Sequence, residues 1–275
     1  MKKKPKIVYY EDPLNDDFAG TSIKKKDFPK RFRYVHKHNI FFTAISFFVY
    51  YFIAFPILWM VGKVGYGVKV KGKRNARSLF RRGVFYYGNH TQIADGWLVQ
   101  CFLANPKRSY VIADADAISI PFLKTIVMML GCLPVPDLAH KEEFEEAIKY
   151  RYQQKRAIAI YPEKHIWPYS THIRPFPDDS FIYPATLGAP VIAFCTTYRK
   201  PLLFSKHRKP KMTVHISRPI YPDMKKSIPE RKKQLRDAVY EFMLDYSAEE
   251  ENIEYIAYLP KEKQASQNTE NEKTL

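Results

Sequence analysis

The sequence of 275 residues contains no glycine-rich phosphate-binding loop and no internal repeat. Without such a loop, nucleotide binding of the common kinds has no support. The chain also has only 3 cysteines, Cys101, Cys132 and Cys195, which are far apart and form no paired motif. Neither a disulfide framework nor a zinc site is therefore indicated. Each cysteine has apolar neighbours, so we expect small buried side chains in a protein that faces a reducing compartment.

Acidic residues are scarce relative to basic ones. The chain has 28 Asp and Glu against 45 Lys and Arg, which gives a formal net charge of +17. Such an excess predicts a polyanionic partner, either nucleic acid or an anionic membrane surface. No nucleic-acid-binding motif is recognised, and the basic residues cluster around an apolar segment. We therefore expect anionic membrane lipids, and no nucleic acid, as partners.

That apolar segment, NIFFTAISFFVYYFIAFPILWMVG at residues 39–62, contains no charged side chain. Its length matches the ~20 residues that one helix needs to cross a bilayer core. However, Pro56 should kink or break the helix, and basic clusters on both sides favour neither orientation. Two arrangements remain: a single tilted span, or two short helices that dip into one leaflet and return. We predict the second, a membrane-embedded helical hairpin.

Four parts follow along the chain. They are a basic N-terminal arm outside the core (1–38), the membrane-associated helical segment (39–64), one globular domain (65–247) and an acidic C-terminal tail, docked at its start (248–275). Within the domain, apolar runs predict strands at 84–87, 109–113, 157–161, 190–198 and 212–217. Longer amphipathic runs predict helices at 94–104, 121–130, 140–154 and 228–246. This alternation predicts an α/β fold with a mainly parallel sheet flanked by helices.

One histidine and one aspartate lie five positions apart in GNHTQIAD, residues 88–95. In a chain with 8 histidines and 28 acidic residues this spacing arises about 0.8 times by chance, and His140 with Glu145 repeats it. His90 differs because a hydrophobic strand and the flexible Gly88 lead into it, and open α/β sheets place their sites at such strand ends.

Within one helix, residues five apart point about 140° away from each other, so His90 must lie in the turn before the helix. From there Asp95 can bind one imidazole nitrogen and leave the other to take a proton from a hydroxyl. Alternatively, His90 only satisfies the turn and Asp95 only caps the helix.

These residues resemble the glycerolipid acyltransferase family, of the bacterial lysophosphatidate acyltransferase type. GNHTQIAD is similar to its Asn-His-x4-Asp signature. Three further blocks follow in the family's order: IPFLKTIVMMLGCLPVPD (120–137), IYPEKHIWP (160–168) and ATLGAPVIAF (185–194). The resemblance covers roughly residues 65–220, and it makes the domain at 65–247 an expected acyltransferase domain.

The resemblance implies a membrane-bound acyltransferase that moves a fatty acyl group from a thioester to the hydroxyl of a lyso-lipid, with lysophosphatidate converted to phosphatidate. His90 is then the general base and Asp95 orients it. The donor is acyl-CoA or acyl carrier protein as co-substrate, and no cofactor and no metal are expected. The location implied is the cell membrane, at its cytoplasmic face.

The acceptor-binding motifs depart from the family pattern. The family places arginines that serve the acceptor phosphate in its second and third blocks, where this chain has GCLPVPD and PEKHIW. We predict that Lys164, His165 and Arg174 supply substitute cations, and that Asn89 and Glu163 complete the substrate-binding residues. If these cations do not restore a phosphate clamp, the acceptor is another lyso-lipid. A catalytically inactive membrane-binding protein is the further alternative.

Overall fold

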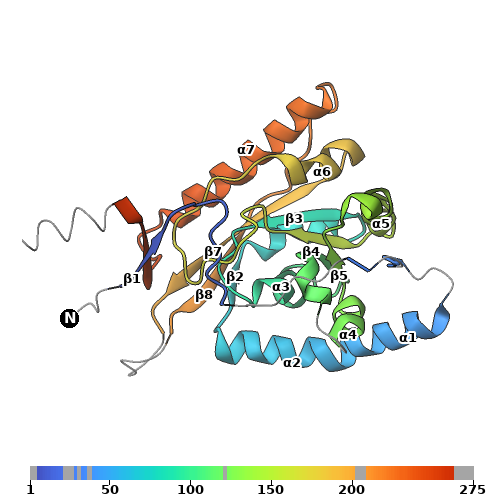
Figure 1. Cartoon of the computed structure of the whole chain (residues 1–275), viewed down its shortest axis with the longest axis horizontal. Coiled ribbons are helices and arrows are strands. Elements are labelled where there is room, and N and C mark those ends of the chain that lie inside the picture. The colour runs from blue at the N-terminus through green and yellow to red at the C-terminus, as the bar shows by residue number, and fades with distance from the viewer. Residues whose placement is uncertain are drawn as a thin grey trace, which may run out of the picture.

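The computed structural model describes residues 5–20, 28–29, 32–35, 39–119, 123–201 and 209–262, with a seven-stranded sheet at its centre (Figure 1). The strand order is β2-β8-β7-β3-β6-β4-β5, and all neighbours are parallel except β7 and β8. The bounds are β2 Lys69–Lys71, β3 Val84–Gly88, β4 Ser109–Ala113, β5 Cys132–Pro134, β6 Ala157–Ile160, β7 Val191–Arg199 and β8 Lys211–Ile216. The predicted α/β fold with a mainly parallel sheet is confirmed.

The five predicted strands are present to within one residue at each end, whereas β2 and β5 were not predicted. Both are edge strands of 3 residues, too short to give a periodic signal. The central strands are apolar on both faces because both faces are covered. Along β3, Phe85 and Tyr87 enter one core, while Val84 and Tyr86 enter the other.

Helices cover both faces of the sheet. α5, α6 and α7 lie on one face, and α3 lies on the other with the long helix that contains α1 and α2 (Figure 1). The bounds are α1 Ile40–Phe48, α2 Phe55–Met60, α3 Asp95–Leu98, α4 Leu123–Met129, α5 Lys141–Gln153, α6 Ile182–Leu187 and α7 Ile228–Ser247. π-helical turns extend α1, α2 and α3 at Val49–Ala54, Val61–Gly65 and Val99–Leu103; 3-10 turns lie at Lys73–Leu79, Ala115–Ile118, Leu138–His140 and Asp179–Phe181.

Residues 40–65 form one continuous helix of 26 residues, so the predicted hairpin is wrong. Pro56 sits at the start of α2, directly after the π-helical turn Val49–Ala54. A proline ring clashes with the backbone of the preceding turn in a regular α-helix. The wider π-helical turn accommodates the ring, so the chain continues without reversing. Among the described residues this is the one helix long and apolar enough to cross a membrane.

The helix at 40–65 lies along the domain rather than apart from it. The Ser46 hydroxyl donates to the Met129 carbonyl at 2.9 Å, and the backbone N–H of Ser109 donates to the Tyr50 hydroxyl at 2.8 Å. Further along the helix, Gly62 approaches Phe102 so closely that a Cβ atom would lie 2.4 Å from its ring.

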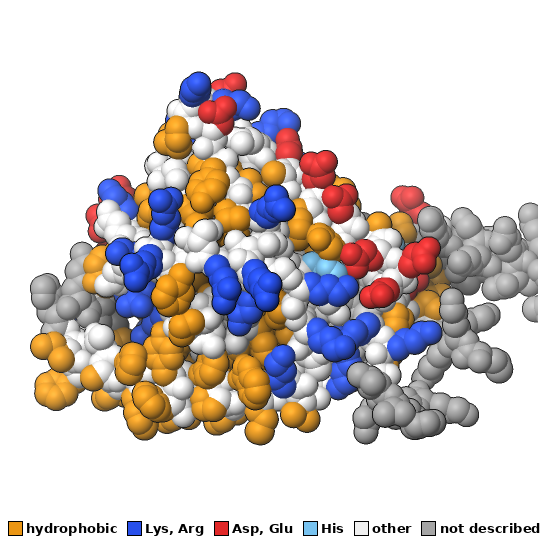
Figure 2. Space-filling view, turned by 180° about the vertical axis from the view of Figure 1, so that it is seen from behind, with side chains coloured by type: hydrophobic (Ala, Val, Ile, Leu, Met, Phe, Trp, Pro, Cys, Tyr) orange, Lys and Arg blue, Asp and Glu red, His pale blue; other side chains and the backbone are white. Residues whose placement is uncertain are grey.

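The opposite side of this helix is apolar and exposed, with Phe41, Phe48, Phe52, Trp59 and Met60 between 44% and 83% exposed. These side chains contribute to the apolar band along the lower edge of the molecule in Figure 2. Lys and Arg side chains lie directly above the band in this view, and most Asp and Glu side chains lie further up and to the right. The surface thus combines an exposed apolar stripe with an adjoining positive zone.

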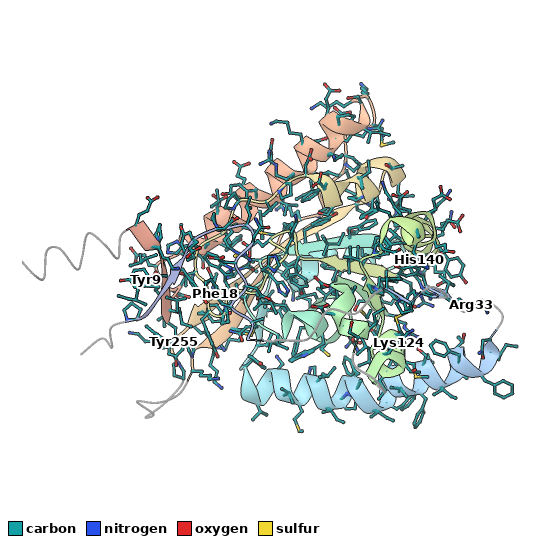
Figure 3. All side chains as sticks on the ribbon, in the orientation of Figure 1. Tyr9, Phe18, Arg33, Lys124, His140 and Tyr255 are labelled. Carbon is teal, nitrogen blue, oxygen red and sulfur yellow. The ribbon has the colours of Figure 1, made fainter. Side chains whose placement is uncertain are left out.

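The described residues among the first 38 take part in the fold, contrary to the predicted arm outside the core. β1 (Lys6–Tyr10) pairs in parallel with β9 (Ile256–Pro260) from the C-terminal segment. Phe32 and Tyr34 are buried at the other end of the domain, where Figure 3 shows Arg33 near Lys124 and His140. Buried aromatic side chains, Phe32 and Tyr34 near the N-terminus and Tyr258 on β9, allow these segments to pack on the domain. The acidic tail beyond residue 262 lies outside the described residues.

Candidate active site

The candidate site follows β3, the central strand of the sheet. A Cβ atom at Gly88 would lie 2.1 Å from the ring of Phe194 on β7, so only glycine allows the two strands this approach. The chain then turns through residues 89–94 and enters α3 at Asp95. His90 therefore lies in the turn and Asp95 in the first helical turn, as their spacing predicts.

The two side chains meet. His90 Nδ1 lies 3.0 Å from Asp95 Oδ2. The Asp95 carboxylate has no exposed surface, while the His90 side chain is 16% exposed. Within the described part of the chain, His90 Nε2 has no hydrogen-bond partner. The imidazole is thus held through one nitrogen and open at the other, which is the arrangement that a general base needs.

Asp95 is fixed by the backbone of the same turn. Its Oδ2 atom also accepts the N–H groups of Thr91 at 2.7 Å and Gln92 at 2.9 Å. Three groups therefore converge on one carboxylate oxygen. The other oxygen, Oδ1, is buried and has no hydrogen-bond partner among the described residues. Such an unsatisfied buried acceptor is costly and is typical of sites kept for function.

Tyr161 forms one wall of the site and was not among the predicted site residues. Its ring stacks on the His90 imidazole with centroids 4.6 Å apart, and its hydroxyl donates to the Asp95 carbonyl at 2.5 Å. Burial raises the pKa of Tyr161 well above its usual value, so the hydroxyl stays protonated as a donor. The available signal was its position directly after β6, at the same sheet edge as His90.

Asn89 does not fit its predicted role in substrate binding. Its side chain is buried and bonds to the backbone of Thr196 in both directions, from Nδ2 to the carbonyl at 3.0 Å and from the N–H to Oδ1 at 2.8 Å. Because both ends of the amide are used, Asn89 ties the turn to β7. It positions its neighbour His90 instead of facing a ligand.

Glu163 and Arg174 form a buried ion pair beneath the turn. Glu163 Oε2 accepts the backbone N–H of His90 at 3.0 Å and lies 3.2 Å from Arg174 Nη2. The two side chains are 1% and 4% exposed. Arg174 also donates to the carbonyls of His165 and Pro13, and its guanidinium stacks over Trp167. The prediction that Arg174 binds the acceptor phosphate is therefore not supported, because its charge is used internally.

The two remaining predicted cations lie beside the site. Lys164 is exposed and adopts a left-handed backbone conformation with φ of 65°, and His165 is partly exposed. Both directly follow Glu163, which contacts the His90 backbone. The second histidine pair of the sequence forms no such site: His140 Nδ1 lies 2.6 Å from Asp137, not from Glu145, at the start of α5.

The site borders the long helix at 40–65. Tyr66, directly after that helix, packs edge-on against Trp97 of α3 with ring centroids 6.0 Å apart. Ile93, between His90 and Asp95, is 63% exposed. The helix that carries Asp95 is therefore in contact with the residue that follows the C-terminal end of the helix at 40–65.

Comparison with known proteins gives two findings. Residues 67–197 match the model of the acyltransferase family. The fold is similar to the crystal structure of the 1-acyl-sn-glycerophosphate (LPA) acyltransferase PlsC from Thermotoga maritima, with a TM-score of 0.54 and 20% sequence identity over 76% of this chain and 90% of that one. No curated protein matches the chain by sequence.

Proposed function

Because residues 67–197 form a domain of the acyltransferase family, we propose that this chain transfers a fatty acyl group from a thioester to the hydroxyl of a lyso-lipid at a membrane surface. The observation that carries the proposal is the contact of His90 Nδ1 with the buried Asp95, which leaves Nε2 open. An inactive membrane-binding protein would have no need of this buried, oriented pair.

The proposed step uses His90 Nε2 to take the proton of the acceptor hydroxyl. The oxygen attacks the thioester carbonyl carbon, a C–O bond forms and the C–S bond breaks. The thiolate leaves with the proton that the imidazolium returns, so no covalent acyl-enzyme forms. Asp95 holds Nδ1 as the protonated nitrogen and stabilises the imidazolium. General-base catalysis of this kind contributes roughly 10²–10⁴-fold to the rate.

We propose acyl-CoA or acyl carrier protein as the donor and the cytoplasmic face of the cell membrane as the location. The exposed apolar stripe of the helix at 40–65 supports membrane association. Because this helix contacts the domain from Ser46 to Gly62, it is suited to lying in the interfacial layer beside the domain. The net charge of +17 adds attraction to anionic lipids.

For the acceptor we propose lysophosphatidate, with Lys164 and His165 beside the phosphate. One observation favours a second candidate. Arg174 is engaged by Glu163, so fewer cations than predicted are available for a phosphate dianion. A lyso-lipid without a terminal phosphate is therefore the alternative acceptor for the same reaction.

A panel assay decides between these acceptors. Purified full-length protein in vesicles is given lysophosphatidate, lysophosphatidylglycerol, lysophosphatidylethanolamine or a lyso-glycolipid, each with acyl-CoA or acyl carrier protein as the donor. We expect acylated product with lysophosphatidate, detected by mass spectrometry, and a loss of that preference in Lys164→Gln. Product from none of the pairs would contradict the proposed function, and product only from phosphate-free acceptors would establish the alternative.

A further inference from the structure

A cavity of about 570 Å³ lies at the sheet edge opposite His90. It is bounded by the 3-10 turn Lys73–Leu79 and by residues 103–107, before β4. β2 runs antiparallel to β3, so the turn that follows β2 meets the N-terminal edge of β3, whereas His90 follows its C-terminal end. A strand of 5 residues separates the two edges by roughly 16 Å. This cavity is therefore distinct from the candidate active site.

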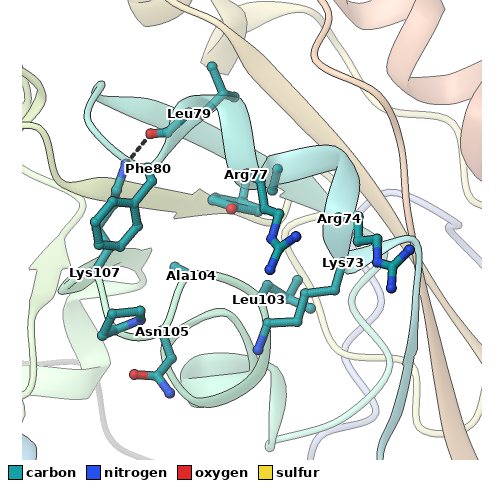
Figure 4. Close-up of a pocket in the computed structure, with 12 residues that line it drawn as sticks. Lys73, Arg74, Arg77, Leu79, Phe80, Leu103, Ala104, Asn105 and Lys107 are labelled. Atoms are coloured by element: carbon teal, nitrogen blue, oxygen red, sulfur yellow. Dashed lines mark hydrogen bonds between the residues drawn. The ribbon is translucent and has the colours of Figure 1, made fainter.

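The walls of the cavity carry four cations, Lys73, Arg74, Arg77 and Lys107. Figure 4 shows Lys73 and Arg77 extending from the 3-10 turn towards Leu103 and Ala104, with Arg74 beside Lys73 on the same turn. Among the described residues, no carboxylate lies within ion-pair distance of any of them. Like charges gathered without counter-charges are unfavourable in the free protein, so this cluster indicates an anionic ligand.

Lys107, on the wall formed by residues 103–107, also supports an anionic ligand. Its ammonium is fixed by the carbonyls of Leu79, at 2.6 Å, and Arg82. Burial, and secondarily the charge of Arg156, lower the pKa of Lys107 to about 8. A bound anion would favour the charged ammonium again. The remaining lining includes Phe80, which is 55% exposed, and Leu103, so an apolar surface adjoins the cations.

The cavity is next to the middle of the long helix. The Tyr51 hydroxyl donates to the carbonyl of Pro106, a lining residue, at 3.1 Å. Interfacial helices bury their apolar face ~5–10 Å into the boundary between headgroups and acyl chains. With the apolar stripe in that position, the lipid phosphates lie at the level just above the helix. Figure 2 shows Lys and Arg side chains at that level.

We propose that this cavity binds the phosphate headgroup of an anionic glycerophospholipid of the membrane, with the cations on the phosphate and Phe80 against the start of the acyl chains. The coenzyme A of a donor also carries phosphates. The lipid is favoured because the cavity adjoins the long helix through the contact of Tyr51 with Pro106, and because a thioester must reach His90 at the opposite ends of the strands. The site would fix the orientation of the domain on the bilayer.

The test compares variants that alter charge with one that fills the cavity. In Arg74→Gln/Arg77→Gln two exposed cations are lost; in Ala76→Phe the cavity is filled at unchanged charge. Lys225→Gln/Lys226→Gln, on the exposed loop before α7, is the matched charge control. Binding of the full chain to vesicles is measured by flotation, with phosphatidylglycerol in phosphatidylcholine and with phosphatidylcholine alone. His90→Ala is included and should bind like the wild type, so this test does not depend on acyl transfer.

We expect Arg74→Gln/Arg77→Gln to weaken binding to the anionic vesicles about 30-fold, from about 1 kcal/mol per cation, and the control pair to weaken it less than threefold. Ala76→Phe should lose the preference for anionic vesicles although its charge is unchanged. Saturable binding of monomeric dihexanoylphosphatidylglycerol, measured by calorimetry, should be lost in the same two variants. The proposal would be overturned by any of three results. These are an equal loss of vesicle binding in both double variants, an unchanged preference of Ala76→Phe for anionic vesicles, and binding of coenzyme A at this cavity in place of the lipid.

Discussion

At the residue scale, the single atom Asp95 Oδ2 holds the turn and the imidazole together, because it contacts His90 Nδ1 and two backbone N–H groups. In Asp95→Asn one carboxylate oxygen becomes an N–H₂ donor, so Nδ1 loses its charged partner. We expect the turnover number to fall by roughly 10²–10⁴-fold with little change in the Michaelis constant for the acceptor. Steady-state kinetics measure this, and a reduced affinity at unchanged turnover would contradict the assigned role.

The buried pair of Glu163 and Arg174 should act by positioning. Removing one partner leaves a buried charge without compensation, so we expect Glu163→Gln to lower the free energy of unfolding by about 3–5 kcal/mol. Glu163→Gln/Arg174→Met should recover part of this loss, because no charge is then stranded.

Glu163 touches His90 only through the backbone N–H. The rate of Glu163→Gln should therefore fall without a shift in its pH dependence. Denaturant unfolding and a pH–rate profile provide the two readouts; full additivity of the two substitutions would argue against the pair.

His215 on β8 gives the protein a pH-dependent stability. Its side chain is buried against Tyr246, and burial, with the charge of Lys71, lowers the pKa of His215 to about 4 although Glu249 lies 3.6 Å away. The unfolded chain then binds a proton between pH 6.5 and 4 that the folded chain does not. Stability should fall as the pH falls through this range, by about 3 kcal/mol in total.

Comparison with His215→Gln isolates this contribution from that of the carboxylates. Glutamine can still bond to Thr197, the hydrogen-bond partner of His215. The unfolding free energy of the variant should fall less steeply between pH 6.5 and 4 than that of the wild type. If the unfolding free energies of the variant and the wild type changed equally with pH, His215 would have the same pKa in the folded and the unfolded chain.

The sequence could locate His90 and Asp95 because a single strand–turn–helix unit contains both. It could not assign Asn89, whose partner Thr196 is 107 residues away on β7. The same holds for Arg174. The sequence shows only a cation near a family motif, whereas the folded loop shows that this cation pairs with Glu163. The role of a residue whose partners are distant in the sequence cannot be predicted from the local sequence pattern.

At the element scale, the long helix depends on close contact with the domain. Gly62 faces Phe102 so closely that any side chain displaces the ring, whereas a Cβ atom at Gly65 would meet nothing nearer than 3.8 Å. We expect Gly62→Ala to destabilise the protein by about 1–3 kcal/mol. Gly65→Ala, a matched control in the same helix, should be neutral or stabilise it by up to about 1 kcal/mol. Thermal unfolding in detergent compares the stabilities of the two variants. Equal changes in stability would mean that Gly62 does not pack against Phe102 as described.

The hairpin prediction failed at this scale for a physical reason. Proline disfavours a regular α-helix, but the penalty depends on the width of the preceding turn. The π-helical turn before Pro56 relieves it, and apolar periodicity contains no information about such a turn. The contacts of Ser46 and Tyr50 with the domain then keep the helix in one piece alongside it.

At the scale of the whole molecule, the described N-terminal segment and the long helix both reach the part of the domain that carries His90 and Asp95. The Asp16 carbonyl accepts the indole N–H of Trp167 at 2.7 Å, and the backbone N–H of Trp167 donates to the His90 carbonyl at 3.1 Å. On another side Tyr66 joins the helix to α3. The segment predicted as a separate arm thus supports the loop behind His90, while the helix is suited to bringing the open side of the site to a lipid surface.

The central claim is that His90 removes the proton of the acceptor hydroxyl. It is tested most directly by the rate of acyl transfer from acyl-CoA to lysophosphatidate by wild-type protein and His90→Ala, both bound to the same vesicles and with matched thermal unfolding. The account predicts a fall of roughly 10²–10⁴-fold in turnover with membrane binding unchanged. A His90→Ala variant that transfers acyl groups at the wild-type rate would contradict it.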